Sequence, residues 1–127
     1  MDILLVNPII RGSKPPFYFP LGLSYIARML LNAGHKVEIL DINALRLTKE
    51  ETTDKIKASK FDLVGLTGLV TEYSQIKWLA SQFKEFHPDN IIILGGGLAT
   101  LAPELVLKKL DIDIVVIGEG EETIKDL

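Results

Sequence analysis

Five short aliphatic runs recur along the chain, with segments of helical periodicity between them. The runs occupy residues 3–6, 37–40, 63–66, 91–94 and 114–117. Their length is that of strands, and largely apolar strands are typical of a parallel sheet covered on both faces. The segments that we expect to be helical are 20–33, 48–58, 72–86 and 103–110, with a fifth helix beginning at 121. This alternation predicts an α/β fold built on one parallel sheet.

Five strands in a chain of 127 residues favour the flavodoxin-like (Rossmann-like) strand order 2-1-3-4-5, with helices on both faces. Ligands of such sheets bind beyond the carboxyl ends of the strands, near the switch point between the first and third strands. A candidate site is therefore expected in the loops that follow Val6, Leu66, Leu94 and Ile117.

Two of the helical segments carry more specific signals. Thr48 followed by Glu51 is the pattern of a capping box, which predicts a helix beginning there. In the first helical segment the spacing predicts that one stripe faces the sheet, formed by Leu21, Tyr25, Met29 and Leu30.

The composition excludes several classes of function. The chain has no cysteine, so it contains neither a disulfide nor a thiolate-held zinc or iron–sulfur site. Fourteen Lys and Arg against 17 Asp and Glu give a formal charge of −3, without the basic excess of a nucleic-acid-binding protein. No apolar run approaches the roughly 20 residues of a membrane span, and the acidic start is unlike a secretory signal. We expect one domain in the cytoplasm.

The first strand-end loop, Asn7-Pro8-Ile9-Ile10-Arg11-Gly12, excludes the common occupants of this fold. It lacks the Gly-x-Gly-x-x-Gly of dinucleotide sites and the hydroxyl-rich phosphate loop of flavodoxins. Asn7 and Thr67 stand where a receiver domain carries carboxylates for magnesium. No nucleophile and base combination is evident, so a small stand-alone enzyme has little support, and we predict no catalytic residue.

Glycine and a small hydroxyl dominate the next two loops. The third strand ends Gly65-Leu66-Thr67-Gly68-Leu69, and the fourth ends Gly95-Gly96-Gly97. Glycine lets backbone approach a flat or bulky ligand, although it also serves tight strand-to-helix turns. Both interpretations remain open from the residues alone. A wide, weakly polar ligand suits these loops better than a nucleotide.

Several short motifs then follow one another in a characteristic order. They are Asn7-Pro8, Pro20-Leu21-Gly22-Leu23, residues 33–37 leading to Asp41, residues 62–67, Gly95-Gly96-Gly97, and Gly118-Glu119-Gly120-Glu121. Over essentially its whole length the sequence resembles the N-terminal cobalamin-binding domain of radical S-adenosylmethionine enzymes. That class includes the magnesium-protoporphyrin IX monomethyl ester cyclases and corrinoid-dependent methyltransferases.

The resemblance implies a cofactor site and a role. The corrin ring would lie across the strand ends, and its dimethylbenzimidazole tail would enter a groove between the sheet and a helix. The implied cofactor-binding residues are Asn7, Pro8, Thr67, Gly68, Leu69, Gly95, Gly96, Gly97, Gly118, Glu119 and Gly120. Residues 1–127 would then be part of a longer protein, followed by a radical S-adenosylmethionine barrel that holds a 4Fe–4S cluster and performs methyl transfer or ring formation on an unactivated carbon.

Departures from the family pattern motivate a second hypothesis. Ile9 stands where some relatives carry a cobalt-ligating histidine, which predicts cobalt without a protein histidine ligand. Leu98 and Ile117 likewise replace polar family residues. The alternative is an interaction domain that keeps the fold and has lost the cofactor.

Other polar and aromatic residues receive simpler interpretations. The sequence places His35 and His87 in solvated turns away from the strand ends. For Asp41 a turn and a cofactor contact stay open, and for Glu119 and Glu121 a helix cap and a cofactor contact do. The aromatic loop 14–20 is expected to cover the upper face of the cofactor or to dock against the next domain, and packing on its own helix is the alternative.

Overall fold

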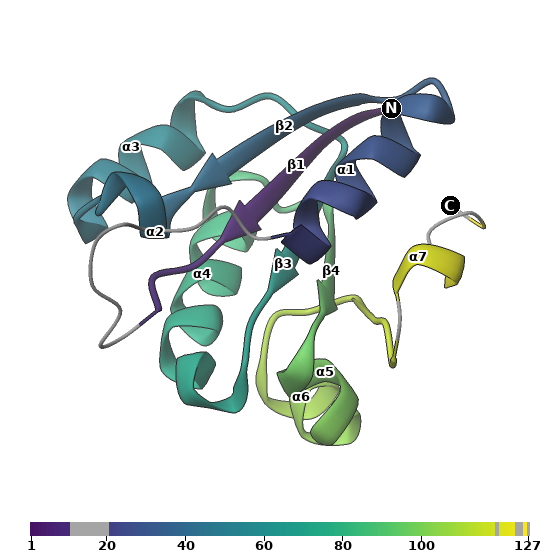
Figure 1. Ribbon diagram of the computed structural model, residues 1–127. Helices are drawn as coiled ribbons and strands as arrows, with labels where there is room; N and C mark the ends of the chain where they lie inside the picture. The colour runs from purple at the N-terminus through teal and green to yellow at the C-terminus, as the bar shows by residue number, and fades with distance from the viewer. Residues whose placement is uncertain (11–20, 119, 124–125, 127) are drawn as a thin grey trace.

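Five parallel strands form one sheet in the order β2-β1-β3-β4-β5, which confirms the predicted fold class. The computed structural model describes residues 1–10, 21–118, 120–123 and 126. Figure 1 shows the strands running side by side toward one edge, the carboxyl edge of the sheet. They are β1 (Asp2–Asn7), β2 (Lys36–Asp41), β3 (Leu63–Thr67), β4 (Ile91–Gly95) and β5 (Ile114–Val115).

Helices cover both faces of the sheet (Figure 1). One face carries α1 (Leu21–Asn32) and the short α7 (Gly120–Thr123). The other carries α3 (Lys49–Ala58), α4 (Tyr73–Phe86) and α6 (Pro103–Lys109). Three one-turn elements follow strands at the carboxyl edge: α2 (Ile42–Leu45), the 3₁₀ turn η1 (Val70–Glu72) and α5 (Gly97–Leu101). No helix in the described part of the chain is long and apolar enough to span a bilayer.

The alternation of side chains along the strands divides the core into two clusters of unequal size. Even-numbered strand residues such as Val64 and Leu94 belong to the larger cluster, beneath α3, α4 and α6. Odd-numbered ones such as Leu5 and Ile93 belong to the smaller cluster, beneath α1. The α1 face therefore has the thinner cover.

The first helix buries a stripe that shares only Leu30 with the predicted one. Leu21 and Tyr25 are 67% and 57% exposed, whereas Leu23, Ala27 and Leu30 are buried. Apolar residues occur nearly all round this helix, so periodicity alone does not select its inner face. Packing against the sheet decides which face of the helix is buried.

The prediction that the strands are covered on both faces is also wrong for β2, because this strand is an edge of the sheet. Its burial alternates, and Lys36 and Glu38 are exposed. β5 ends at Val115, two residues earlier than expected, and forms the other edge.

The predicted capping box at the start of α3 is confirmed. The Thr48 hydroxyl accepts from the Glu51 N–H at 3.1 Å, and Glu51 Oε1 accepts from the Thr48 N–H at 3.2 Å. The short helices α2 and α5 were not predicted. Gly97, expected in a glycine loop, is instead the first residue of α5, and Gly96 is its N-cap.

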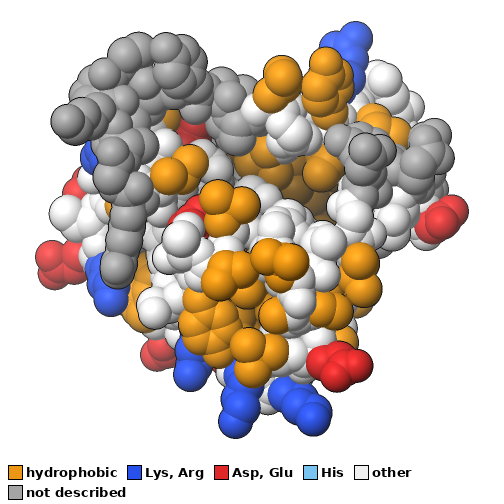
Figure 2. Space-filling model, turned by 60° about the horizontal axis from the view of Figure 1, so that its bottom comes forward, with side chains coloured by type: hydrophobic (Ala, Val, Ile, Leu, Met, Phe, Trp, Pro, Cys, Tyr) orange, Lys and Arg blue, Asp and Glu red, His pale blue; other side chains and the backbone are white. Residues whose placement is uncertain are grey.

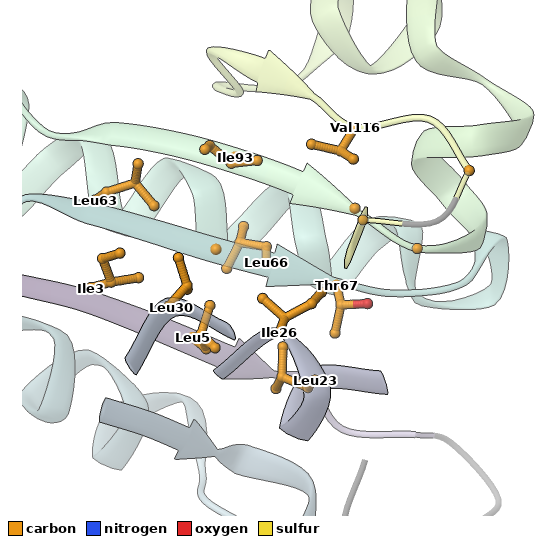
Figure 3. A pocket seen from close by; sticks show the side chains of 15 residues that line it. Ile3, Leu5, Leu23, Ile26, Leu30, Leu63, Leu66, Thr67, Ile93 and Val116 are labelled. Carbon is orange, nitrogen blue, oxygen red and sulfur yellow. The ribbon is translucent and has the colours of Figure 1, made fainter. Parts of the chain in front are cut away.

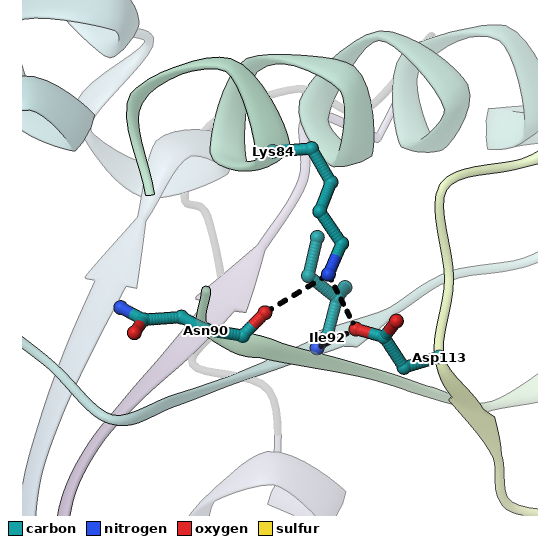
Figure 4. Close-up of polar contacts among 4 residues, drawn as sticks. All are labelled: Lys84, Asn90, Ile92 and Asp113. Atoms are coloured by element: carbon teal, nitrogen blue, oxygen red, sulfur yellow. Dashed lines mark hydrogen bonds and ion pairs between the residues drawn. The ribbon is translucent and has the colours of Figure 1, made fainter. Parts of the chain in front are cut away.

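A polar contact joins α4 to β4 and to the residue that precedes β5 (Figure 4). Lys84 Nζ donates to Asp113 Oδ2 at 2.8 Å and to the Asn90 carbonyl at 3.0 Å. The same carboxylate oxygen accepts from the Ile92 N–H at 2.8 Å. Burial opposes ionisation of Asp113, but the hydrogen bonds from Lys84 and Ile92 and the charge of Lys84 outweigh it. The pKa of Asp113 is lowered as a result.

This lowered pKa predicts a contribution to acid stability. The ionised carboxylate stabilises the fold above the unfolded pKa of about 3.9, and the contribution disappears as pH falls through the folded value. Asp113 is 40% exposed, so water screens the ion pair, and we expect Asp113→Asn to lower the free energy of unfolding by at most about 1 kcal/mol at neutral pH. The variant should then lose less stability than the parent on acidification.

Urea unfolding across the acid range measures both effects. Asp111→Asn removes an exposed carboxylate two residues away and serves as the control, which should keep the parental acid dependence. Identical acid slopes for Asp113→Asn and the parent would contradict the assignment.

Candidate cofactor-binding groove

A narrow groove opens on the thinly covered face, between α1 and α7 and above β3 and β4. Its volume is about 80 Å³. Figure 3 shows side chains of α1 on one side of it, Ile93 and Val116 on the other, and the strands as its floor. The floor residues from the three central strands share odd numbers and hence one face of the sheet: Ile3, Leu5, Leu63, Gly65, Thr67, Ile93 and Gly95.

Glycine in the floor keeps the groove open. A Cβ added at Gly95 would have no atom within 4 Å outside its chain neighbours, so this position faces empty space. A Cβ at Gly65 would lie 2.8 Å from Leu5 Cδ2, so there the floor is already close-packed. The free space is therefore concentrated toward the carboxyl edge.

The two walls come from distant parts of the sequence. Leu23, Ile26 and Leu30 of α1 form one wall, and Gly118 and Gly120 belong to the other. A Cβ at Gly120 would lie 3.4 Å from Ile26 Cδ1, which is ordinary van der Waals contact, so the two walls face each other across a short gap.

Thr67 is the only described lining residue whose side chain can form a hydrogen bond. It lies at the end of β3, and the groove opens as a hollow in the face that Figure 2 brings forward, with hydrophobic side chains gathered beside it. No charged side chain is among the described lining residues. Such a groove can hold a flat apolar group, and it offers no acid or base to a reaction.

The structure brings part of the predicted site together. Thr67, Gly95, Gly96, Gly118 and Gly120 all line the groove. Glu119 lies outside the described residues.

The other predicted residues of the third and fourth loops lie beside the groove. Gly68 packs against Ile76 of α4, where a Cβ would overlap the isoleucine side chain. A Cβ at Gly97 would lie 3.0 Å from Leu69 Cδ2. Leu69 itself is exposed at the carboxyl edge. These positions shape the loops that border the groove.

Asn7 and Pro8 are buried and do not line the groove. Asn7 Nδ2 donates to Asp41 Oδ1 at 3.0 Å, and the same oxygen accepts from the Ala44 N–H at 3.0 Å. Asp41 is thus the N-cap of α2, which favours the turn interpretation over a cofactor contact. Asn43, which was not predicted, is buried and accepts from the Ile10 N–H at 2.9 Å.

Most of the apolar lining was missed by the sequence analysis. A usable signal existed for the floor: Leu63, Gly65 and Thr67 share the parity of Ile93 and Gly95. Alternation along two neighbouring strands would have placed the small residues on one face. The α1 wall had no such signal, because the wrong stripe of that helix was expected to be buried.

Two of the three residues that depart from the family pattern, Ile9 and Leu98, have structural roles. Ile9 packs against the larger core cluster. Leu98 is only 1% exposed, and its N–H donates to the Gly68 carbonyl at 3.0 Å. The third, Ile117, is exposed.

Both histidines lie at the amino edge of the sheet, away from the groove mouth. His35 precedes β2, with its ring Nδ1 3.3 Å from the terminal amine. The prediction of a solvated turn is wrong for His87. Its Nε2 donates to the Ile56 carbonyl at 2.7 Å, and its ring contacts Phe61 with centroids 4.6 Å apart.

A second pocket, of about 400 Å³, lies on the opposite face between α3 and α4. Its polar lining includes Thr52, Ser74 and Gln75, and Trp78 borders it with Lys49 Nζ 5.2 Å from the indole centroid. None of the residues predicted to bind cofactor lines it. The aromatic loop 14–20 lies outside the described residues.

Comparisons with known proteins show the family of the chain. The family model for the B12 binding domain matches residues 9–127. The chain is 36% identical over 135 residues to an uncharacterized methyltransferase of Pyrococcus horikoshii, covering 100% of this chain and 28% of the relative. It is 34% identical over 134 residues to the anaerobic magnesium-protoporphyrin IX monomethyl ester cyclase of Synechocystis, covering 100% and 27%. The chain thus spans about a quarter of the length of these relatives.

A solved structure shares the fold. The radical S-adenosylmethionine methyltransferase TsrM of Kitasatospora setae, with tryptophan and a S-adenosylmethionine analogue bound, superposes with a TM-score of 0.81 at 23% identity, over 98% of this chain and 24% of that one. Its fold resembles that of the corresponding domain of cobalamin-dependent radical S-adenosylmethionine enzymes. The family match over residues 9–127 shows that the chain belongs to the B12-binding domain family.

Proposed function

We propose that this domain binds cobalamin and positions it for a radical S-adenosylmethionine catalytic domain. The observation that carries the proposal is the apolar groove with open space above Gly95, at the carboxyl edge where ligands of this topology bind. The residues present fit the cofactor, because a benzimidazole is flat and largely apolar and the described lining is hydrocarbon apart from Thr67.

In this proposal each part of the site has a task. The hydrocarbon walls from α1 and Val116 hold the benzimidazole by burying its surface. The Thr67 hydroxyl is placed at the mouth to hydrogen-bond the nucleotide tail. The exposed Leu69 at the carboxyl edge would contact the corrin ring.

Entry of the base requires the groove to widen. An enclosed apolar cavity of about 150 Å³ binds benzene, whereas the groove measures about 80 Å³. One wall therefore moves outward on binding. The wall containing α7 is the weaker one, because α7 has only four residues.

When bound, the corrinoid supplies cobalt as a carrier of methyl groups or electrons, chemistry that no side chain here provides. This chain's residues bind and orient the cofactor and exclude water from its tail. Its two histidines lie at the far edge of the sheet, which supports binding without a histidine from this chain on cobalt. We further propose that residues 1–127 belong to a longer protein whose radical S-adenosylmethionine domain carries the 4Fe–4S cluster, since the relatives are about four times as long.

The alternative, an interaction domain without cofactor, is motivated by Leu98 and Ile117. It predicts that bulky side chains fill the groove. Open space at Gly95 supports the cofactor hypothesis instead, and the role of Leu98 in the core explains its apolar character without loss of the site.

Titrating the purified protein with hydroxocobalamin tests the proposal. We expect saturable binding with the visible spectrum of the form in which the benzimidazole has left cobalt, because the base is in the groove. Absence of any spectral change would contradict it. For the parent protein, a Cys-x-x-x-Cys-x-x-Cys motif encoded downstream of Leu127 is expected, and a stop codon there would contradict that part.

A further inference from the structure

We infer that the groove also selects among corrinoids by the base of the nucleotide tail, accepting benzimidazoles and discriminating against adenine. This inference rests on the proposed function, since it concerns the same groove. It goes beyond cofactor binding because natural corrinoids share the corrin ring and differ in this base.

Among the described residues, no polar side chain lines the depth of the groove, where a purine would need one. From its mouth at Thr67 the groove runs back along β3 toward Leu63. Ile3, Leu30, Leu63 and Ile93 line this inner part, and all four are buried hydrocarbons. Whatever edge of the base points inward contacts only hydrocarbon among the described residues.

The backbone of the floor offers little more. β3 pairs along its length with β1 on one side and β4 on the other, including Thr67 opposite Gly95. The amides and carbonyls beneath the groove therefore bond to neighbouring strands. They are not free to receive a ligand.

The two bases differ in the polar atoms that they bring into this space. Apart from the nitrogen that is attached to the ribose, dimethylbenzimidazole has one ring nitrogen and an edge with two methyl groups. Adenine has additional ring nitrogens and an exocyclic amine in the same place. The Thr67 hydroxyl can pair with one group at the mouth, so the remaining polar atoms of adenine lose their water without replacement.

Equilibrium binding of three corrinoids to the purified protein tests the inference: cobalamin, its analogue with unsubstituted benzimidazole, and the adenine analogue. Trp78 is the only tryptophan and lies on α4, outside the groove, so quenching of its emission reports binding without a change to the site. We expect the two benzimidazole forms to bind within a few-fold of each other and the adenine form to bind at least about tenfold more weakly.

A groove variant gives an independent check. Ile26→Gln places an amide on the α1 wall, where it can pair with adenine. The variant should therefore reduce the difference in affinity between the benzimidazole corrinoids and the adenine corrinoid. Arg28→Gln puts the same side chain on the exposed side of α1 and should keep the parental preference. The wild-type comparison stands even if the Ile26 variant does not fold.

The outcomes separate this inference from the proposed function. Equal affinity for all three corrinoids overturns the selectivity and leaves cobalamin binding intact. Failure of all three to bind overturns the proposed function itself. Tight binding of cobalamin with weak binding of the adenine form, reduced by Ile26→Gln, supports both.

Discussion

Replacing Gly95 with leucine should weaken cobalamin binding about a hundredfold while the domain stays folded. Gly95 faces the open part of the groove, and its backbone does not have a positive φ, so β4 accepts a side chain there. The leucine would occupy the volume meant for the base. Excluding roughly 120 Å² of apolar surface from burial forfeits about 3 kcal/mol, or about a hundredfold in Kd.

Corrinoid titration measures the loss, and urea unfolding measures the stability, which should stay equal or rise as the leucine becomes buried. Ala33→Leu adds the same side chain at an exposed position at the amino end of the sheet and should bind like the parent. Undiminished binding by folded Gly95→Leu protein would show that the base lies elsewhere.

Gly96→Ala should be the most destabilising of the loop substitutions. Gly96 has φ +86° and ψ −168°, a region that only glycine adopts readily. A Cβ there would also lie 2.7 Å from Thr67 Oγ1 and 3.0 Å from the Gly68 carbonyl oxygen. Backbone strain and the displaced β3 loop together should lower the free energy of unfolding by about 3 kcal/mol, or roughly 10 °C in Tm.

Gly34→Ala separates the two causes, because Gly34 has φ +92° with no atom within 4 Å of an added Cβ. Gly34→Ala should therefore lower the free energy of unfolding by about 1 kcal/mol, through backbone strain alone. If thermal or urea unfolding shows that Gly96→Ala and Gly34→Ala lose the same free energy of unfolding, contact between the β3 and β4 loops contributes nothing to the effect at Gly96.

Much of the fold could be predicted because its signals are local. The parallel sheet follows from the alternation of strands and helices, the number of strands favours its order, and the capping box at Thr48 needs only residues three apart. The one-turn helices α2 and α5 lack such signals. Their caps are Asp41, which also bonds Asn7 from another strand, and Gly96, which has no side chain.

The site was predictable only in its small residues at the strand ends. Thr67, Gly95 and Gly96 follow buried strands, so their place at the carboxyl edge is a consequence of topology. Gly68 and Gly97 look the same in sequence, yet one packs under α4 and the other begins α5. Which glycine borders open space depends on the neighbours that approach it.

The sequence by itself determined the parallel sheet, its strand order and the small residues at its carboxyl edge, because these depend on periodicity and on residues adjacent in the chain. Only the tertiary structure decided which stripe of α1 is buried and that Ile26 and Gly120 form facing walls. Those choices depend on how segments almost a hundred residues apart share the surface of one sheet. The groove is the space that remains when α1 and α7 together cover that face incompletely.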